Sequence, residues 1–260
     1  MKLYNGKRKP LRPISAALFF CLALLFWFSA WQIAAARVQL ALLLPFPGQV
    51  LQRLAELLRE ASFWQTVLAS LRRIFLGYAL AVVLGSLLAV FTAFTPALRQ
   101  VVALPMNIIK ASPVASFVIL ALVWIASDSL PLFICFLMVL PMVWSNVETG
   151  ILQADENLLE MAWVYQFSRV KLWRTVYLPA IKPFFTTACL VGFGFAWKSG
   201  VAAEVLSLPK LGIGTKLYLA KIYLETPDLF AWTLVVISIS IAFEFLLAFW
   251  LQKKWRKPAE

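Results

Sequence analysis

Few residues in this chain have the chemistry of a reactive site, and those few are ionisable side chains inside or beside long apolar runs. The 260 residues include no histidine, which excludes a histidine-based catalytic triad and an imidazole metal ligand. Cys21, Cys135 and Cys189 lie far apart and match neither a zinc spacing nor a disulfide framework, so we interpret them as packing residues. A phosphate-binding Gly-x-x-x-x-Gly-Lys-Ser/Thr run is also missing. We therefore expect no catalytic residue, no metal site and no cofactor in this chain.

The charged residues near apolar runs are candidates for a solute pathway, because placing a charge in lipid is unfavourable. Lys198 and Glu204 lie near the outer end of one run, where they could pair, line a pathway, dock an external protein or simply snorkel to the interface. Lys110 could line a pathway or anchor its run at the inner interface, and Pro113 should kink or interrupt that helix. Glu244 lies deeper in its run, where we expect a structural partner.

The composition indicates that these residues belong to a membrane protein. Hydrophobic residues make up 62% of the chain and the mean hydropathy is +0.84, whereas a soluble domain has about 45–50% apolar residues. A bilayer core takes about 20 apolar residues of helix, and six stretches are long enough. They are Ile14–Ala36, Ile74–Phe94, Val101–Ala126, Leu130–Ile151, Ala180–Lys198 and Phe230–Leu251. We expect an all-α polytopic membrane protein with about six transmembrane helices and one domain, residues 1–260.

The basic residues indicate the orientation in the membrane. The net charge is +12, but the lysines and arginines cluster at the termini and in short loops, which is typical of membrane topology rather than of nucleic-acid binding. Six spans place both termini on one side. If that side is the cytoplasm, it holds 15 of the 24 lysines and arginines. Arg72 and Arg73 must then lie at the outer end of the second span.

Two outer connections are too long to be simple turns. Residues 50–59 carry leucines at helical spacing after Pro45 and Pro47, which predicts a short amphipathic helix on the membrane interface. Residues 200–229 mix glycine, proline and charge, and could re-enter the membrane or cap a cavity.

The segment from about 152 to 179 is the most informative polar stretch. Asp155 stands where a helix amino terminus would favour an acid, and Leu158, Leu159 and Ala162 share one face of that helix. Glu148, just before this segment, could cap it. A small residue at position 162 would let the helix approach a partner closely.

The second half of this segment has the pattern of another short helix. Ser168 can cap it, and Leu172 and Trp173 continue an apolar surface. Two short helices with an exposed apolar face form a docking element. The alternative is an amphipathic loop that lies on the inner leaflet.

This segment resembles the loop that marks permease subunits of ATP-binding-cassette (ABC) importers. The family pattern has Glu-Ala-Ala, a Gly after three more residues, and a Leu-Pro pair that begins twelve residues after the Gly. Glu160-Met161-Ala162, Gln166 and Leu178-Pro179 occupy those positions here. Met161 replaces the first Ala, and Gln166 replaces a Gly that would permit a positive φ, which predicts either a strained turn or a different one.

The resemblance extends over most of the chain, and several further motifs are similar to those of one subgroup of these permeases. The relevant residues are Pro45–Pro47, Ser70–Tyr78, Ala196-Trp197-Lys198 with Ala202-Ala203-Glu204, and Gly212-Ile213-Gly214. The subgroup imports nitrate, sulfonates and taurine, and has relatives that import pyrimidine precursors of thiamine.

The resemblance implies a type I ABC importer permease in the cell (inner or plasma) membrane. Two permease copies would form the pathway, a cytoplasmic ATPase would bind ATP–Mg and supply the energy, and an extracytoplasmic binding protein would deliver a small, anionic solute. Glu160, Met161, Ala162, Gln166, Ser168, Leu178 and Pro179 would belong to the ATPase-coupling loop. Import of a thiamine-precursor pyrimidine, and a stand-alone secondary transporter or channel, are the alternatives.

Overall fold

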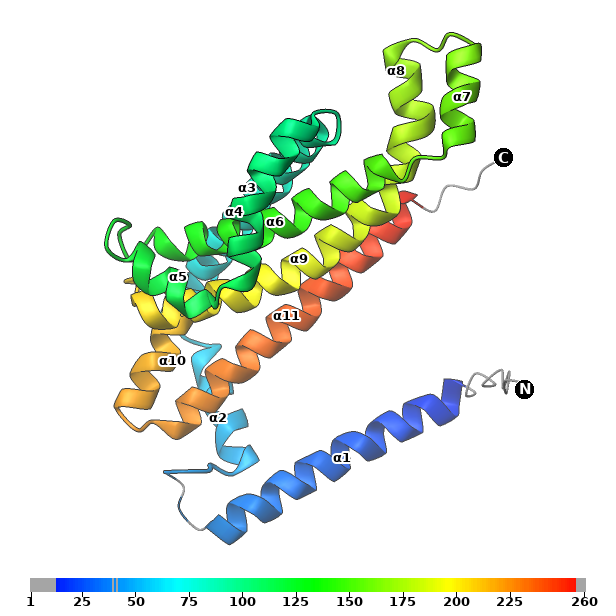
Figure 1. The fold of residues 1–260 in the computed structure, drawn as a ribbon. Helices are drawn as coiled ribbons and strands as arrows, with labels where there is room; N and C mark the ends of the chain where they lie inside the picture. The colour runs from blue at the N-terminus through cyan, green and yellow to red at the C-terminus, as the bar shows by residue number, and fades with distance from the viewer. Residues whose placement is uncertain (1–12, 39, 41, 256–260) are drawn as a thin grey trace, which may run out of the picture.

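The computed structural model describes residues 13–38, 40 and 42–255, and every regular element among them is helical (Figure 1). The elements are α1 (Pro13–Val38), α2 (Pro47–Leu57), α3 (Ala61–Ala93), α4 (Pro96–Ala111), α5 (Val114–Ala121), α6 (Leu130–Leu152), α7 (Glu156–Val164), α8 (Arg169–Leu172), the π-helix η1 (Trp173–Tyr177), α9 (Leu178–Ser207), α10 (Ile213–Ile222) and α11 (Thr226–Trp255). The predicted all-α fold is confirmed.

Five helices of the described residues are long and apolar enough to cross a membrane, and a bent pair of helices forms a sixth candidate. That pair, α4 and α5, takes the place of the third predicted span, Val101–Ala126; the interruption expected at Pro113 is confirmed, and the pair turns by 105°. Ser112 and Pro113 both have extended backbone at the break. Proline has no N–H to donate and holds the residue before it out of the helical region, so the helix ends there.

Two other spans are longer than predicted. α3 begins at Ala61 instead of Ile74, and α9 continues to Ser207 instead of ending at Lys198. The predicted outer segment 200–229 is therefore mostly helical, since it contains the end of α9, all of α10 and the start of α11.

The centre of the molecule is a bundle of α3, α6 and α9, in which each helix packs against the other two. Small residues permit this packing. A Cβ on Gly77 would lie 2.3 Å from the carbonyl oxygen of Leu132, and one on Gly200 would lie 2.6 Å from Cys135 Sγ. Helices pack through small residues in membranes because lipid gives no hydrophobic force between them. Cys135 and Cys189 are buried in this bundle, whereas Cys21 is exposed on α1.

The predicted amphipathic helix exists as α2, but its apolar side packs against α11. Val50 and Leu57 are buried there, and Leu51 remains exposed. Arg53 of α2 forms an ion pair with Asp228 of α11, and this hydrogen bond raises the pKa of Arg53 above its usual value. α2 is thus attached to α11, at the end of the molecule opposite α7 and α8 (Figure 1).

The first and last spans leave the two described ends of the chain at the same end of the molecule. Figure 1 shows the amino end of α1 and the carboxyl end of α11 on the side of α7 and α8, with α2 and α10 on the opposite side. This arrangement agrees with an even number of membrane crossings, counting the bent pair as one.

Candidate functional site

The segment that precedes α9 folds as two capped helices, as the sequence predicted. Asp155 Oδ1 accepts a hydrogen bond from the Asn157 N–H at 2.9 Å and caps α7. Ser168 Oγ accepts one from the Lys171 N–H at 3.4 Å and caps α8. Each side-chain oxygen satisfies an amide that the first turn of a helix leaves free.

The turn between these helices contains a strained glutamine. Gln166 has a φ of 48°, in the left-handed region that glycine adopts at no steric cost. The Phe167 N–H donates to the carbonyl of Ala162 at 2.9 Å, and the Gln166 N–H donates to that of Trp163 at 3.0 Å. This is the Schellman pattern of helix ends. The first of the two expected alternatives is therefore confirmed, because the turn is kept and glutamine bears the strain.

Ala162 faces the interior of this segment and not a partner. It is buried against Val176 and Ala154, with Leu172 packed against the same cluster. The expectation that a small residue at 162 admits a partner is wrong, since its size instead lets α7 approach η1.

The exposed surface of this segment lies at the end of α7. Glu160 and Met161 are exposed, and the exposed fractions of Trp163, Val164 and Tyr165 are 83%, 66% and 72%. The last three were not predicted from the sequence, although two aromatic residues in a polar connection are a recognisable signal for an interface. We call Met161, Trp163, Val164 and Tyr165 the α7 patch.

The segment is joined to the membrane helices by η1. Trp173 and Tyr177 of η1 contact the ring of Phe94, which follows α3, with ring centroids 6.0 and 5.6 Å apart. Leu178 and Pro179 then begin α9 and are exposed. A movement of the α7 patch can therefore be transmitted through η1 to α3, by the contacts with Phe94, and to α9, which follows η1 directly.

A cleft of about 360 Å³, lined mainly by apolar side chains, lies beside the break between α4 and α5. Its lining comes from α4, α5, α6 and α9 and the break itself: Ile109, Lys110, Ser112, Val114, Met138, Met142, Ser145 and Phe195. Lys110 Nζ lies 5.9 Å from the centroid of the Trp144 ring. No carboxylate of the described residues lies within 4 Å of this ammonium group. Pro113 thus interrupts the span beside an unpaired cation.

Glu148 is a buried residue of α6 and does not cap the next helix. Its side chain is 5% exposed, and its Oε2 accepts a hydrogen bond from Arg99 Nε at 3.1 Å. Its Oε1 is buried and has no hydrogen-bond partner among the described residues. The pairing of Glu148 with Arg99 could not be predicted from the sequence, because the two residues are 49 positions apart in the chain.

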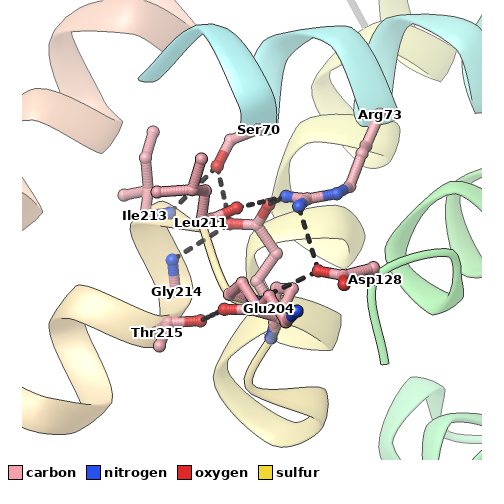
Figure 2. Close-up of polar contacts among 10 residues, drawn as sticks. Ser70, Arg73, Asp128, Glu204, Leu211, Ile213, Gly214 and Thr215 are labelled. Atoms are coloured by element: carbon pink, nitrogen blue, oxygen red, sulfur yellow. Dashed lines mark hydrogen bonds and ion pairs between the residues drawn. The ribbon is translucent and has the colours of Figure 1, made fainter. Parts of the chain in front are cut away.

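Glu204 is a structural residue near the carboxyl end of α9 (Figure 2). It is completely buried, and its carboxylate accepts hydrogen bonds from Ser70 Oγ at 2.8 Å, the Gly214 N–H at 3.0 Å and Arg73 Nη1 at 3.2 Å. Arg73 also contacts Asp128 at 3.4 Å. We call these residues the outer clasp. It explains how Arg73 is tolerated about three turns inside α3, because the carboxylates of Glu204 and Asp128 neutralise its charge.

Lys198 is not part of the outer clasp. Six residues of helix turn by about 600°, so Lys198 and Glu204 point about 120° apart, and the possible pair between them is not formed. Lys198 is exposed and lines a second cleft of about 440 Å³ with Phe195 and Glu244. Glu244 accepts a hydrogen bond from Ser240 Oγ at 3.5 Å on its own helix. Phe195 lies between the two clefts, since it lines both.

Known proteins resemble this chain in sequence. A taurine transport system permease protein of Escherichia coli K12 is 24% identical over 82% of this chain and 80% of its own length. A probable ABC transporter permease of Brucella melitensis is 29% identical over 76% of this chain and 80% of its own length. A bicarbonate transport system permease of Synechococcus elongatus is 23% identical over 75% of this chain and 70% of its own length.

A solved structure also has a similar fold. A crystal structure of an amino acid ABC transporter with histidines superposes with a TM-score of 0.58 at 16% identity, covering 72% of this chain and 89% of that one. The family model for the binding-protein-dependent transport system inner membrane component matches residues 81–257, which include α4 to α11. This chain belongs to that family of ABC importer permeases.

Proposed function

We propose that this permease carries a small anionic solute of the taurine, nitrate or bicarbonate kind, and that a separate ATPase drives it through residues 152–179. The single observation that supports the coupling role is the α7 patch, an exposed apolar surface on a polar connection that is capped at both helices. An exposed apolar patch on a helix is a docking surface for a groove.

The complete importer would contain three further kinds of subunit: the ATPase, a second copy of this chain and a binding protein. The ATPase binds ATP–Mg on the cytoplasmic side, where we place both termini, and this chain holds no cofactor. A second copy of the chain completes the pathway, and an extracytoplasmic binding protein delivers solute at the end that carries α2 and α10. Glu160 and Gln166 help to form the coupling loop, and Lys198, Lys110 and Pro113 contribute to the pathway surface.

The solute class rests on chemistry shared by the relatives. Taurine, bicarbonate and nitrate, which the names of similar permeases specify, each carry an oxyanion group. The two clefts of this chain present Lys110 and Lys198, and Lys110 has no counter-ion within 4 Å among the described residues. Both lysines are exposed, and an ammonium group without a nearby carboxylate attracts an anion.

A pair of tyrosines provides a matched test of the coupling role. Tyr165 in the α7 patch is 72% exposed, and Tyr223, at the end of α10 on the opposite side, is 69% exposed. Tyr165→Glu should weaken ATPase binding by about 30-fold or more, the effect of a truncated interface hot spot of about 2 kcal/mol. Tyr223→Glu should leave binding unchanged.

The measurement is co-purification of the ATPase with each variant at matched membrane levels. If Tyr165→Glu retains as much ATPase as Tyr223→Glu, the α7 patch is not the docking surface.

A further inference from the structure

Two opposite charges lie on one exposed face of the membrane-spanning helices. Lys198 belongs to the apolar span that ends at Ser207, and Glu244 belongs to the span Thr226–Phe249. Both side chains are exposed, and both line the cleft of about 440 Å³ between α9 and α11. Neither forms an ion pair within the part of the chain that the structure describes, and the one hydrogen bond that Glu244 accepts there comes from Ser240 on its own helix.

The depth of these two groups makes lipid an unfavourable neighbour. Lys198 lies nine residues, or about 14 Å of helix, before the end of α9 at Ser207. Glu244 lies nine residues before Lys253, the next charged residue along α11. Charged residues inside membrane spans almost always face protein or a water-filled cavity, and they pair with one another. This face of the chain is therefore covered by protein or water in the membrane.

The carboxylate and the ammonium group lie at similar depths. A Cβ on Gly194 would lie 3.0 Å from Glu244 Oε1, so this carboxylate lies against the backbone of α9. Lys198 follows Gly194 by four residues and is on the same side of α9. The two charged groups are thus separated by about one helical turn along α9.

A second copy of the chain is the occupant that fits this pair of charges. Two copies that are related by a two-fold axis along the membrane normal present the same residues to each other at the same depth. Lys198 of one copy and the partner's Glu244 are therefore at matching depths. The interface is self-complementary, since the same pair occurs twice across the axis.

We propose that this face joins two copies of the chain, and that Lys198 of each copy pairs with Glu244 of the partner subunit. The proposal rests on the proposed function in one respect, that two copies form the importer, and it adds the surface through which they meet. Such a pair selects which surfaces meet and adds little to the folding of each chain. The pathway between the copies then passes an ion pair at this depth, and Lys110 remains its unpaired cation.

Two copies with opposite charges on this face provide the test. One full-length copy carries Lys198→Glu, and a second copy with a different affinity tag carries Glu244→Lys. The first copy then has two carboxylates on the face, and the second has two ammonium groups. When the two copies meet, each acid faces a base, whereas like charges meet within either chain and between identical copies. The design therefore distinguishes a pair between copies from a pair within one chain.

The measurement is the fraction of each tagged copy that is recovered with the other after expression in the same cells. Unaltered copies should mix at random. The Lys198→Glu and Glu244→Lys copies should favour the mixed dimer over identical dimers by about ten-fold or more, because attraction replaces repulsion at two places about 4 Å across. Lys221→Glu in one copy and Glu225→Lys in the other are the matched control. Both residues are exposed at the turn between α10 and α11, so these copies should mix at random.

A second measurement does not depend on charge. With Cys21→Ser in both copies, Lys198→Cys in one copy and Glu244→Cys in the other should be joined by a short bismaleimide, in which each thiol adds across one maleimide double bond. Cys135 and Cys189 are buried and should not react. Lys221→Cys and Glu225→Cys should give no linked dimer.

The outcomes separate the proposal from the proposed function. Random mixing of the Lys198→Glu and Glu244→Lys copies, or equal preference in the control copies, would overturn the proposal. Absence of the linked dimer from Lys198→Cys and Glu244→Cys would also overturn it, even if the charge variants failed to fold. If unaltered tagged copies are not recovered together at all, the second copy in the proposed function is refuted instead.

Discussion

Replacing Glu204 by alanine should destabilise the contacts among α3, α9 and the start of α10. The change removes the acceptor for Ser70, Arg73 and the Gly214 N–H, in a place with no access to water. Arg73 keeps only Asp128, which is half exposed, as a charged partner. Removing one member of a buried ion pair costs about 3–5 kcal/mol.

This loss can be measured as a shift of the thermal unfolding midpoint in detergent. For a chain of this size, about 1 kcal/mol corresponds to roughly 2–4 °C, so Glu204→Ala should lower the midpoint by about 6–20 °C. Glu204→Gln should lower it less, because the amide oxygen still accepts from Ser70 and Gly214 while its NH₂ group faces Arg73.

Lys198→Ala is the matched control, since Lys198 is exposed on the same helix. It should change the free energy of unfolding by less than about 0.5 kcal/mol. If Glu204→Ala unfolds at the temperature of Lys198→Ala, then the outer clasp does not stabilise the chain and its assignment is incorrect.

Three further predictions follow from the coupling loop and the topology. Gln166→Gly should stabilise the loop by about 1 kcal/mol, because glycine adopts the left-handed φ of 48° without steric cost; a lower unfolding midpoint would contradict the Schellman turn. Ala162→Trp should overpack the contact with Val176, cost about 1–3 kcal/mol and reduce ATPase co-purification, whereas Ala202→Trp, at an exposed site on α9, should not. A reporter that is active only outside the cytoplasm, fused after Glu260, should be inactive, and strong activity would reverse the proposed orientation.

The spans and the loop could be predicted from the sequence because their signals are local. Apolar length identified the spans, and Asp155 and Ser168 identified the starts of α7 and α8. Pro113 predicted an interruption, but the 105° bend depends on how α5 packs against α6 and α9.

The partners of charged residues could not be predicted, since they come from distant parts of the chain. Arg73 is 131 residues from Glu204 in the chain. The apolar runs between them do not show how the helices are aligned against one another, so they do not predict which charged residues meet. For the same reason the sequence paired Glu204 with the nearby Lys198 as one alternative. The direction of Ala162 was misjudged because periodicity shows which residues share a face, and not which neighbour covers it.

ATP-driven uptake by purified components tests the central claim most directly. The chain is reconstituted in vesicles with its ATPase and binding protein, and entry of labelled taurine, nitrate or bicarbonate is followed with and without ATP. We predict uptake of one of these anions only with ATP and all components, and no ATP hydrolysis by the chain alone. Uptake without the ATPase, or ATP hydrolysis by the isolated chain, would contradict the assignment of this chain as a permease driven by a separate subunit.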